Sequence, residues 1–223
     1  GVKPELTWIN SKDIETGSLK VAALAKYDGI IVPGGFGESG IEGLLAVIRY
    51  ARENKIPYLG LCYGMQLLVI EYTRNVCGLK NAQTTEIDPH TKNPVIDIML
   101  EQKALLAQGR YGASMRLGTY EARLKKGTVA QAAYGKDVIW ERHRHRYEVN
   151  NVYIPQLEAA GLVFSGTSPS GELMEIAELP KSVHPFFVAS QFHPEFLSKP
   201  NRPHPLFRGF IAAAHERMHH KPI

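Results

Sequence analysis

The chain has 223 residues, of which 44% are hydrophobic and 22% are charged, enough for one globular α/β domain over residues 1–223. No apolar run reaches the ~18 residues that cross a bilayer, so the sequence predicts no membrane segment. The formal net charge is +4, but basic and acidic residues alternate and only residues 142–146 are densely basic, so nucleic-acid binding is not expected.

The first recognisable elements are a strand, a helix and a second strand. The runs GIIVP at 29–33 and IPYLGL at 56–61 are apolar, as in buried strands. Between them, apolar residues at i, i+3, i+4 and i+7 give a helix one apolar face, made of Ile41, Leu44, Leu45 and Ile48. A strand–helix–strand unit of this length predicts that the two strands are parallel neighbours.

The remaining chain is richer in strands. A helix is expected after Cys62 as far as a cap at Gly78, followed by a loop at 80–94. A final helix is expected at about 205–218, with Leu206, Phe210, Ala213 and Ala214 on one side. Strand-like stretches lie at 95–100, 115–124, 138–149, 162–167, 172–179 and 186–192. The predicted fold is an open, mostly parallel, flavodoxin-like sheet flanked by helices, with an added antiparallel portion.

The segment GLCYG at 60–64 stands between a predicted strand and a predicted helix. Its G-x-C-x-G pattern is that of a nucleophile elbow, with Cys62 at the strained central position. Gly60 and Gly64 would be required because a Cβ there would collide with the neighbouring strand or helix. The dipole of the following helix would favour the thiolate. The alternative is a structural cysteine between two accidental glycines.

A thiol nucleophile needs a base, and the segment SQFHPEF offers one. His193 and Glu195 are two residues apart, so in an extended segment their side chains would leave on the same side. The segment follows a predicted strand and would lie at the carboxyl edge of the sheet, as the elbow does. Taken alone, H-P-E would be interpreted as a surface turn.

The glycine-rich loop VPGGFGESG at 32–40 also follows a predicted strand. It lacks the Lys-Ser/Thr pair of a Walker motif and the spacing of a dinucleotide fingerprint, so a phosphate site is a weak interpretation. The favoured interpretation is an oxyanion hole in which backbone N–H groups of Gly34, Gly35 and Tyr63 stabilise a tetrahedral intermediate.

The other histidines and cysteines have simpler interpretations. His143 and His145 would share one face of a strand, away from the neighbouring arginines, but no third ligand follows at a recognisable spacing, so no metal site is predicted. A polar strand that faces a partner or lines a pocket is the favoured interpretation. His219 and His220 are expected to be solvated and Cys77 to fill apolar space. Two cysteines make no disulfide framework, which predicts a reducing, cytoplasmic location.

Three segments in this order, PGGFG, GLCYGMQ and QFHPEF, resemble the class I, triad-type glutamine amidotransferases. A narrower resemblance, to the glutaminase domains of the CTP synthase family, extends from about Asp28 to Arg217. It is carried by EGLLAVIRYARENKIPYLGLCYGMQ, MRLG, ERHRHRYEVNN and HPLFRGFIAAA, and RHRHRYEVN is too long and unusual a string for chance.

The resemblance implies a Cys62 nucleophile that attacks the side-chain amide of L-glutamine and forms a glutamyl thioester. His193 would transfer the protons and Glu195 would orient it, while Gly35 and Tyr63 would supply oxyanion donors. The residues expected around glutamine are Gly35, Tyr63, Gly64, Met65, Gln66, Glu86 and Arg146. A carboxylate and a guanidinium suit the α-ammonium and α-carboxylate of the free amino acid.

The family also implies partners outside this chain. No cofactor is expected here, because ATP, Mg²⁺ and UTP belong to a synthetase domain that receives the ammonia, and GTP is expected to activate the glutaminase. The parent is expected to be a homotetramer. The chain lacks the P-loop of that domain and has neither an initiating Met nor a signal peptide, so we expect an excised domain that alone makes no CTP.

Two departures from the family stand out. Tyr63 replaces the Leu of many relatives, with little expected effect because the chemistry uses its backbone N–H. The chain also begins later than related domains, which would leave a strand unpaired. Two alternative functions stay open: a stand-alone γ-glutamyl hydrolase, which shares the triad but not RHRHRYEVN, and a regulatory or assembly module without turnover.

Overall fold

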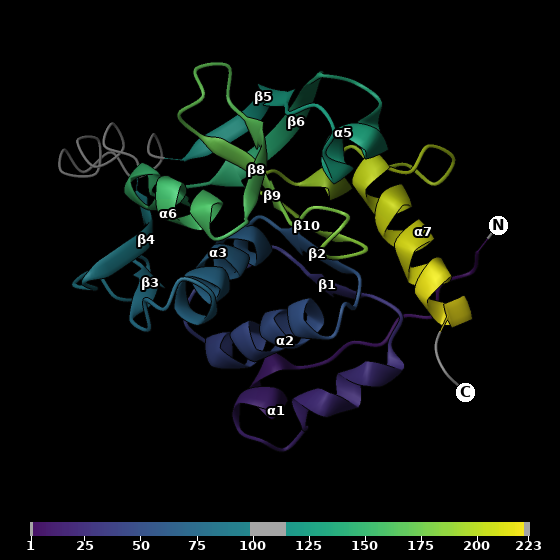
Figure 1. Cartoon of the computed structure of the whole chain (residues 1–223), viewed down its shortest axis with the longest axis horizontal. Helices are drawn as coiled ribbons and strands as arrows, with labels where there is room; N and C mark the ends of the chain where they lie inside the picture. Colours follow the sequence, from purple (N-terminus) through teal and green to yellow (C-terminus); the bar gives the residue numbers. More distant parts are fainter. Residues whose placement is uncertain (1, 99–114, 221–223) are drawn as a thin grey trace.

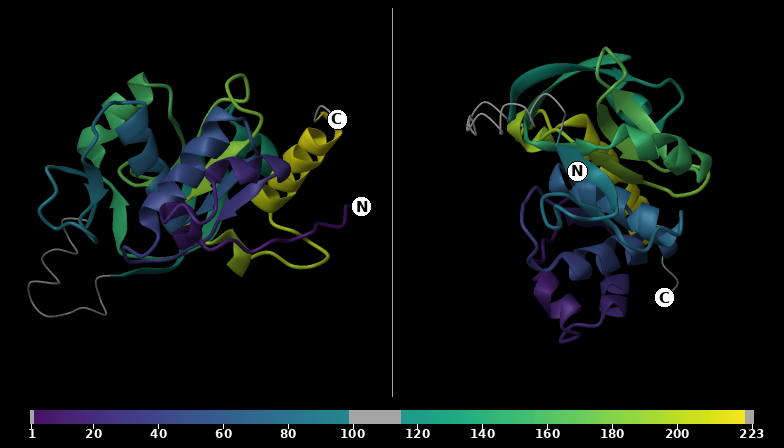
Figure 2. Two further views of the ribbon diagram at one scale, coloured as in Figure 1. Left: turned by 90° about the horizontal axis from the view of Figure 1, so that it is seen from below. Right: turned by 90° about the vertical axis from the view of Figure 1, so that its left-hand side faces the viewer.

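The computed structural model describes residues 2–98 and 115–220, and the fold is built on a seven-stranded sheet (Figure 1). The strand order is β1-β2-β10-β9-β8-β5-β6, and β3, β4 and β7 form a smaller second sheet. Figure 2 shows this smaller sheet at the opposite end of the molecule from the last helix. No helix in the described ranges is both long and apolar enough to cross a membrane.

The predicted strand–helix–strand unit is confirmed. Strand β1 (Ile30–Val32) pairs in parallel with β2 (Tyr58–Leu61), and helix α2 (Ile41–Glu53) connects them. Strand β10 (Phe187–Ser190) lies on the other side of β2 and is also parallel to it. The carboxyl ends of these three strands therefore meet at one edge of the sheet.

The antiparallel portion is larger than the sequence indicated. It contains β9 (Met174–Glu178), β8 (Val163–Thr167), β5 (Arg116–Leu124) and β6 (Val138–His145), each antiparallel to its neighbour. The sheet is therefore mixed, with the parallel strands at one end.

Two sequence expectations require correction. The predicted strand at 138–149 is broken at Arg146, because β7 (Tyr147–Val149) leaves β6 and pairs with β4 (Asn93–Ile98). The predicted loop at 80–94 contains β3 (Ala82–Thr84), which pairs in parallel with β4. Three residues are too short to produce a periodic signal. The last two residues of the predicted strand at 95–100 lie outside the described residues.

The longer helices agree with their predicted positions. Helix α3 (Tyr63–Asn75) follows Cys62, and Gly78, just after it, has the left-handed φ of 78°. Helix α7 (Pro205–His220) buries Leu206, Phe210 and Ala213, as predicted. The short elements were not predicted; they are α1 (Ser11–Glu15), η1 (Val21–Lys26), α5 (Val129–Tyr134), η3 (Asn151–Tyr153), α6 (Ile154–Ala159) and η4 (Pro194–Phe196).

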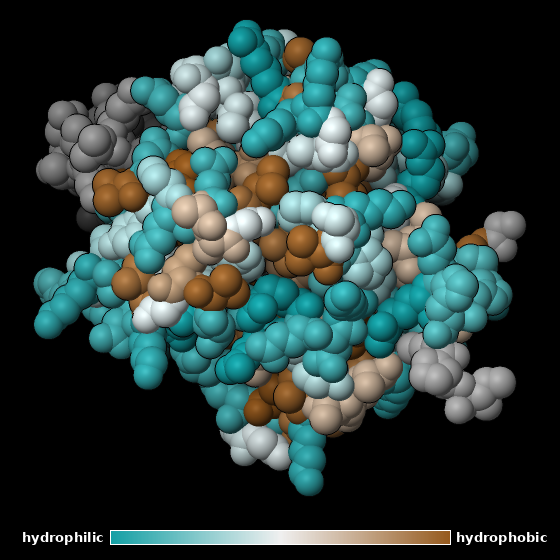
Figure 3. Space-filling view, in the orientation of Figure 1, coloured by the Kyte–Doolittle hydropathy of each residue, from teal (hydrophilic) through white to brown (hydrophobic). Residues whose placement is uncertain are grey.

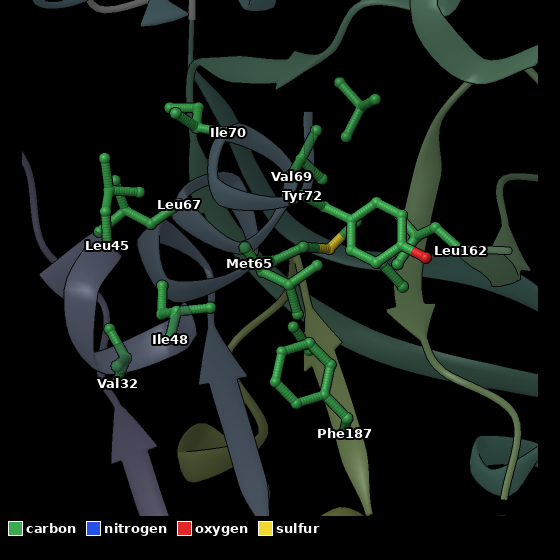
Figure 4. Packing of buried hydrophobic residues seen from close by; sticks show 14 of the residues in the cluster. Val32, Leu45, Ile48, Met65, Leu67, Val69, Ile70, Tyr72, Leu162 and Phe187 are labelled. Atoms are coloured by element: carbon green, nitrogen blue, oxygen red, sulfur yellow. The ribbon is translucent and has the colours of Figure 1, made fainter. Parts of the chain in front are cut away.

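The sheet separates two apolar layers. Along β2, Tyr58 belongs to the core on the α2–α3 side, whereas Leu59 and Leu61 belong to the core under α7. Figure 4 shows the first core, where α2 and α3 pack on the strands. In Figure 3 the visible face is mainly hydrophilic, with apolar residues in separate groups. The packed layers hold the carboxyl edge of the parallel strands rigidly, and the predicted site lies at that edge.

Candidate active site

Cys62 lies at a sharp, strained turn between β2 and α3. Its backbone has φ 49° and ψ −96°, and among the described residues only one other non-glycine, Lys55, has a positive φ. The Cys62 N–H donates to the carbonyl of Ser190 at 2.7 Å, and its carbonyl accepts from the N–H of Met65 at 3.0 Å. Such backbone strain persists only where surrounding contacts enforce it. The predicted elbow is confirmed as a turn, and the cysteine itself is only 5% exposed.

The glycines on either side of the cysteine are required for steric reasons, as predicted. A Cβ on Gly60 would lie 2.8 Å from the carbonyl carbon of Gly64 and 2.9 Å from Cβ of Ala189. A Cβ on Gly64 would lie 2.4 Å from the carbonyl oxygen of Val32. These contacts are to backbone or to short side chains that cannot move away, so β1, β2 and α3 can approach each other only because both positions lack a side chain.

Replacing Gly64 with Ala should therefore push α3 away from β1. We expect the free energy of unfolding, measured in urea, to fall by about 1–3 kcal/mol or more. Alkylation of Cys62 by a glutamine analogue should also be lost, because the turn that positions the sulfur moves. Gly171→Ala is the control for labelling, since a Cβ there meets nothing within 4 Å, although its left-handed φ of 80° means that the variant loses some stability through backbone strain alone. That variant should be labelled like the wild type, and wild-type stability and labelling of Gly64→Ala would contradict the steric account.

His193 and Glu195 are hydrogen-bonded just beyond β10. Nδ1 of His193 lies 2.6 Å from Oε1 of Glu195. The sequence suggested an extended segment, but Pro194–Phe196 form a turn of 3₁₀ helix. The backbone N–H of His193 donates to the carbonyl of Arg142 at 2.9 Å, and its ring stacks on Phe196 with centroids 4.9 Å apart. The imidazole is therefore held by backbone, carboxylate and aromatic ring.

The second nitrogen of His193 is left for a reaction partner. Its Nε2 is buried and has no hydrogen-bond partner in the structure. Because Nδ1 faces a carboxylate, Nδ1 carries the proton and Nε2 holds a free lone pair in the neutral ring. This is the arrangement of a general base whose orientation is fixed by an acid.

Gly34 lies between Cys62 and the imidazole of His193. A Cβ on Gly34 would lie 2.9 Å from Cε1 of His193 and 3.9 Å from Cβ of Cys62. The two side chains therefore lie on either side of Gly34, near one another at the carboxyl edge of the parallel strands, although they are far apart in the chain. A Cβ at position 34 would clash with the imidazole of His193.

The thiol of Cys62 is protonated at rest, contrary to the expectation that the helix dipole favours a thiolate. Its pKa is raised to about 12, chiefly by burial and in smaller part by the carboxylates of Glu148 and Glu195. The N–H of Tyr63 and the amide of Gln191 lower the pKa but do not outweigh burial. Deprotonation therefore has to accompany attack, with a neighbouring base taking the proton.

This protonation state predicts the pH dependence of alkylation. Only the thiolate reacts, and its pKa of about 12 exceeds the ordinary value of 9.0. In a Cys77→Ala variant, the rate with iodoacetamide should rise about tenfold per pH unit from about pH 8 to about pH 11, without a plateau. The rate is measured by intact mass. A plateau near pH 9 would show that the sulfur has an ordinary pKa.

The glycine-rich loop lies over the elbow and is tied to it. A Cβ on Gly35 would be 3.3 Å from Cδ1 of Tyr63, and the hydroxyl of Tyr63 donates to the carbonyl of Gly37. The N–H of Gly37 donates to Oε1 of Glu86 at 3.4 Å. Because Gly34 and Gly35 have no side chains, the backbone of this loop can come close to the elbow, as an oxyanion hole would require.

The structure divides the predicted glutamine-binding residues into two groups. Glu86 is half-buried, and although burial raises the pKa of its carboxyl, the guanidinium of Arg146 and the N–H of Gly37 oppose that shift. Gln66 is buried, with Nε2 3.1 Å from the carbonyl of Tyr147, the residue after Arg146. Met65 differs, because its side chain is fully buried in the core (Figure 4). It can offer a ligand only its backbone, as can Gly64.

Sequence reasoning missed two features. Gln191 is fully buried, and its Nε2 lies 3.6 Å from the sulfur of Cys62. A buried cluster of ionisable side chains lies behind the site, formed by Arg116, His143, His145, Glu148 and Glu175. Gln191 stands within SQFHPEF, but no spacing rule singles it out. Among the described residues, no group of three or more His, Cys, Asp or Glu side chains could hold a metal ion.

The two histidines of that cluster are not pocket-lining. His143 and His145 are 2% and 5% exposed, and Nδ1 of the first lies 2.9 Å from Nε2 of the second. Burial and the charge of Arg116 lower their pKa values to about 2 and about 3, so both are neutral. Their alternation with outward-facing Arg142 and Arg144 is as predicted.

This geometry, a strained cysteine beside an oriented histidine under a glycine loop, agrees with the result of the family comparison. The family described as glutamine amidotransferase class-I matches residues 1–213. This chain belongs to the class I glutamine amidotransferases. The amidotransferase is 56% identical over 209 residues to the CTP synthase of Halalkalibacterium halodurans and 53% identical over 219 residues to that of Thermococcus gammatolerans. These alignments cover 94% and 98% of the amidotransferase but only 38% and 40% of those proteins.

One solved structure gives the same family, and a second shares only the fold. The Trypanosoma brucei CTPS glutaminase domain with bound acivicin matches with a TM-score of 0.88 and 37% identity, over 96% of the amidotransferase and 82% of that chain. A putative GMP synthase protein from Thermoplasma acidophilum shares the fold, with 16% identity and a TM-score of 0.57 over 90% of the amidotransferase and 79% of that chain. The expected fold and family of the amidotransferase are thus confirmed.

Proposed function

We propose that this chain hydrolyses L-glutamine to glutamate and ammonia, using Cys62 as nucleophile, His193 as base and acid, and Glu195 to orient His193. The observation that carries the proposal is that Cys62 and His193 both lie next to Gly34, with the Nε2 of His193 unpartnered. A buried thiol next to an oriented imidazole is suited to acyl transfer.

In the first half-reaction, the Sγ–H proton passes to Nε2 of His193 as sulfur attacks the amide carbon. The C–S bond forms and the carbonyl oxygen takes the negative charge, which the N–H groups of Gly35 and Tyr63 stabilise. His193 then gives its proton to the amide nitrogen. The C–N bond breaks, ammonia leaves and a glutamyl thioester remains on Cys62.

In the second half-reaction, His193 takes a proton from water as the oxygen attacks the thioester. The C–S bond breaks, glutamate is released and the proton returns to the sulfur. Throughout both steps, Glu195 accepts the Nδ1–H of His193 and stabilises the imidazolium.

The substrate's amino-acid group would be recognised by opposite charges at the entrance of the site. Glu86 would pair with the α-ammonium and Arg146 with the α-carboxylate. The proximity that lets the Arg146 charge lower the pKa of Glu86 supports this assignment. Gln66 and the backbone of Gly64 and Met65 would complete the pocket.

The relatives named CTP synthase suggest where the ammonia goes. The chain spans 38% of the length of the Halalkalibacterium halodurans protein, so a parent protein of that kind would contain a second, larger part. We propose that this part is a synthetase domain that uses ATP, Mg²⁺ and the released ammonia to convert UTP to CTP. Activation by GTP, a homotetrameric parent and a cytoplasmic location also remain predictions.

The test is to incubate the protein with L-glutamine and measure glutamate and ammonia. Equal amounts of both are expected, with no cleavage of a γ-glutamyl peptide under the same conditions. Cleavage of the peptide would favour the stand-alone γ-glutamyl hydrolase. A folded protein that releases nothing and is not alkylated by a glutamine analogue would favour a non-catalytic module.

A further inference from the structure

One polar side chain at the site has no role in the proposed reaction: Gln191, the residue directly after β10. Its backbone N–H donates to the carbonyl of Glu175 at 2.8 Å, which ties the end of β10 to β9. Its side chain is fully buried, and Nε2 lies 3.6 Å from the Sγ of Cys62. The amide therefore contacts the atom that reacts.

The neighbours of Gln191 determine which end of its amide faces the sulfur. Nε2 of Gln66 lies 3.1 Å from the carbonyl oxygen of Tyr147, which can only accept a hydrogen bond, so this end of Gln66 is the NH₂ group. The same NH₂ group lies 3.4 Å from the side-chain oxygen of Gln191. The NH₂ group of Gln191 is then directed at Cys62, and a backbone carbonyl fixes both amides.

The charges around the sulfur explain why a donor is needed there. Glu148 of β7 and Glu195 of η4 both disfavour a negative sulfur, and burial does so more strongly. From β6, the carbonyl of Arg144 lies 4.0 Å from Sγ and can only accept the thiol proton. The groups that favour a negative sulfur are the N–H of Tyr63, at the start of α3, and the amide of Gln191.

We infer that Gln191 is a catalytic residue whose side-chain N–H stabilises the negative charge on Cys62. The charge appears when the thiol proton moves to His193, and again when the C–S bond of the thioester breaks and sulfur leaves with the electron pair. This inference rests on the proposed function, in which Cys62 is the nucleophile. A neutral amide suits the role because it remains a donor at every pH and does not compete with His193 for the proton.

The test compares two substitutions in a Cys77→Ala background. Gln191→Met keeps the length of the side chain and removes the donor, and Gln191→Asn keeps the amide but shortens its reach. Ser190→Ala is the matched control, since this adjacent buried hydroxyl donates to the carbonyl of Phe192 and not to the sulfur. Each variant is first checked for cooperative unfolding, and iodoacetamide rates at Cys62 and glutamine kinetics are then measured.

Both Gln191 variants should react with iodoacetamide about tenfold more slowly than the parent at each pH from about 8 to about 10, as expected for one lost hydrogen bond to a charged group. The kcat for glutamine should fall by a similar factor with little change in KM. Ser190→Ala should match the parent in both assays. If a folded Gln191 variant had the parent's alkylation profile and kcat, the inference would be overturned. In that case the parent would still be active, and the proposed function would stand. A parent that neither reacts at Cys62 nor hydrolyses glutamine would overturn the proposed function itself.

Discussion

Replacing Cys62 with Ser is expected to lower kcat/KM for glutamine hydrolysis by about 10⁴-fold or more, the scale seen when a triad loses its nucleophile. Serine has nearly the same shape as cysteine, and the contacts of Cys62 with Gln191 and the Arg144 carbonyl are long even for sulfur, so the variant should lose little by the exchange and fold normally. Its hydroxyl is far less acidic than the thiol, so the imidazole of His193 activates it much less. Glutamate release measures the effect, with intact mass confirming that the analogue no longer alkylates position 62.

The control for this substitution is Cys77→Ala. Cys77 is half-buried, and its sulfur lies 4.0 Å from the carbonyl of Gln156, away from the site. Its loss should leave the hydrolysis rate unchanged. If Cys62→Ser retained more than about 1% of the wild-type rate, the sulfur would not be the nucleophile.

The largest expected effect on stability comes from replacing Arg116 with Met. The side chain of Arg116 is 6% exposed. Its guanidinium lies 2.7 Å from a carboxylate oxygen of Glu175 and 3.7 Å from one of Glu148. Without the cation, two buried carboxyl groups would lose their charge partner, so we expect the free energy of unfolding to fall by about 3–5 kcal/mol at neutral pH. Urea denaturation measures this loss.

The pH dependence of the Arg116→Met effect has a definite sign. Burial already raises the pKa values of Glu148 and Glu175, and Arg116 opposes the rise, so its removal raises both folded-state values further. A carboxyl group whose pKa is higher in the folded than in the unfolded state lowers the free energy of unfolding when it is ionised. This penalty disappears when the group is protonated. The loss of stability should therefore shrink as pH falls from neutrality toward the unfolded pKa of glutamate. A loss that grew on acidification would contradict this account.

Arg49→Met is the matched control for the buried pair. Arg49 lies 2.8 Å from Glu53 one turn along α2, but the two side chains are 54% and 45% exposed. Exposed pairs at this spacing contribute about 0.3–0.5 kcal/mol, so this substitution should be nearly neutral. Equal losses for the two arginines would show that burial does not determine the difference.

The parts of the fold that sequence predicted are those set by local pattern. The apolar runs around Ile31 and Leu59, with a helix between them, specify parallel neighbours because the crossover leaves few alternatives. The two glycines around Cys62 identify the elbow, since a Cβ at either position would collide with adjacent backbone or side chains. The order of the three motifs then identified the family.

The parts that sequence could not predict depend on contacts between distant segments. Arg116 meets Glu175 because β5 and β9 flank β8, and no spacing reveals that pairing. The protonated state of Cys62 has the same origin. The turn and helix were predicted, but the burial that raises the thiol pKa comes from the strands and loops that close over it. A local dipole argument could not include that desolvation.

The site residues show the same division. His193 and Glu195 were singled out because they stand in one short motif, whereas Gln191, two residues earlier, contacts the sulfur only through the bend after β10. The spacing of His143 and His145 predicts that they share one face of the strand. It does not predict that Glu148 and Glu175 cover this face. The two-residue period of a strand predicts which face a side chain lies on, but tertiary packing decides which residues lie opposite that face.

The central claim is that the sulfur of Cys62 and the imidazole of His193 act as one unit at the carboxyl edge of the sheet. Its most direct test is reaction with a chloroketone analogue of L-glutamine, followed by intact mass and peptide mapping. We predict one adduct per chain, at Cys62, formed much more slowly in His193→Gln. An adduct at another residue, or a His193→Gln variant labelled at the wild-type rate, would contradict the claim.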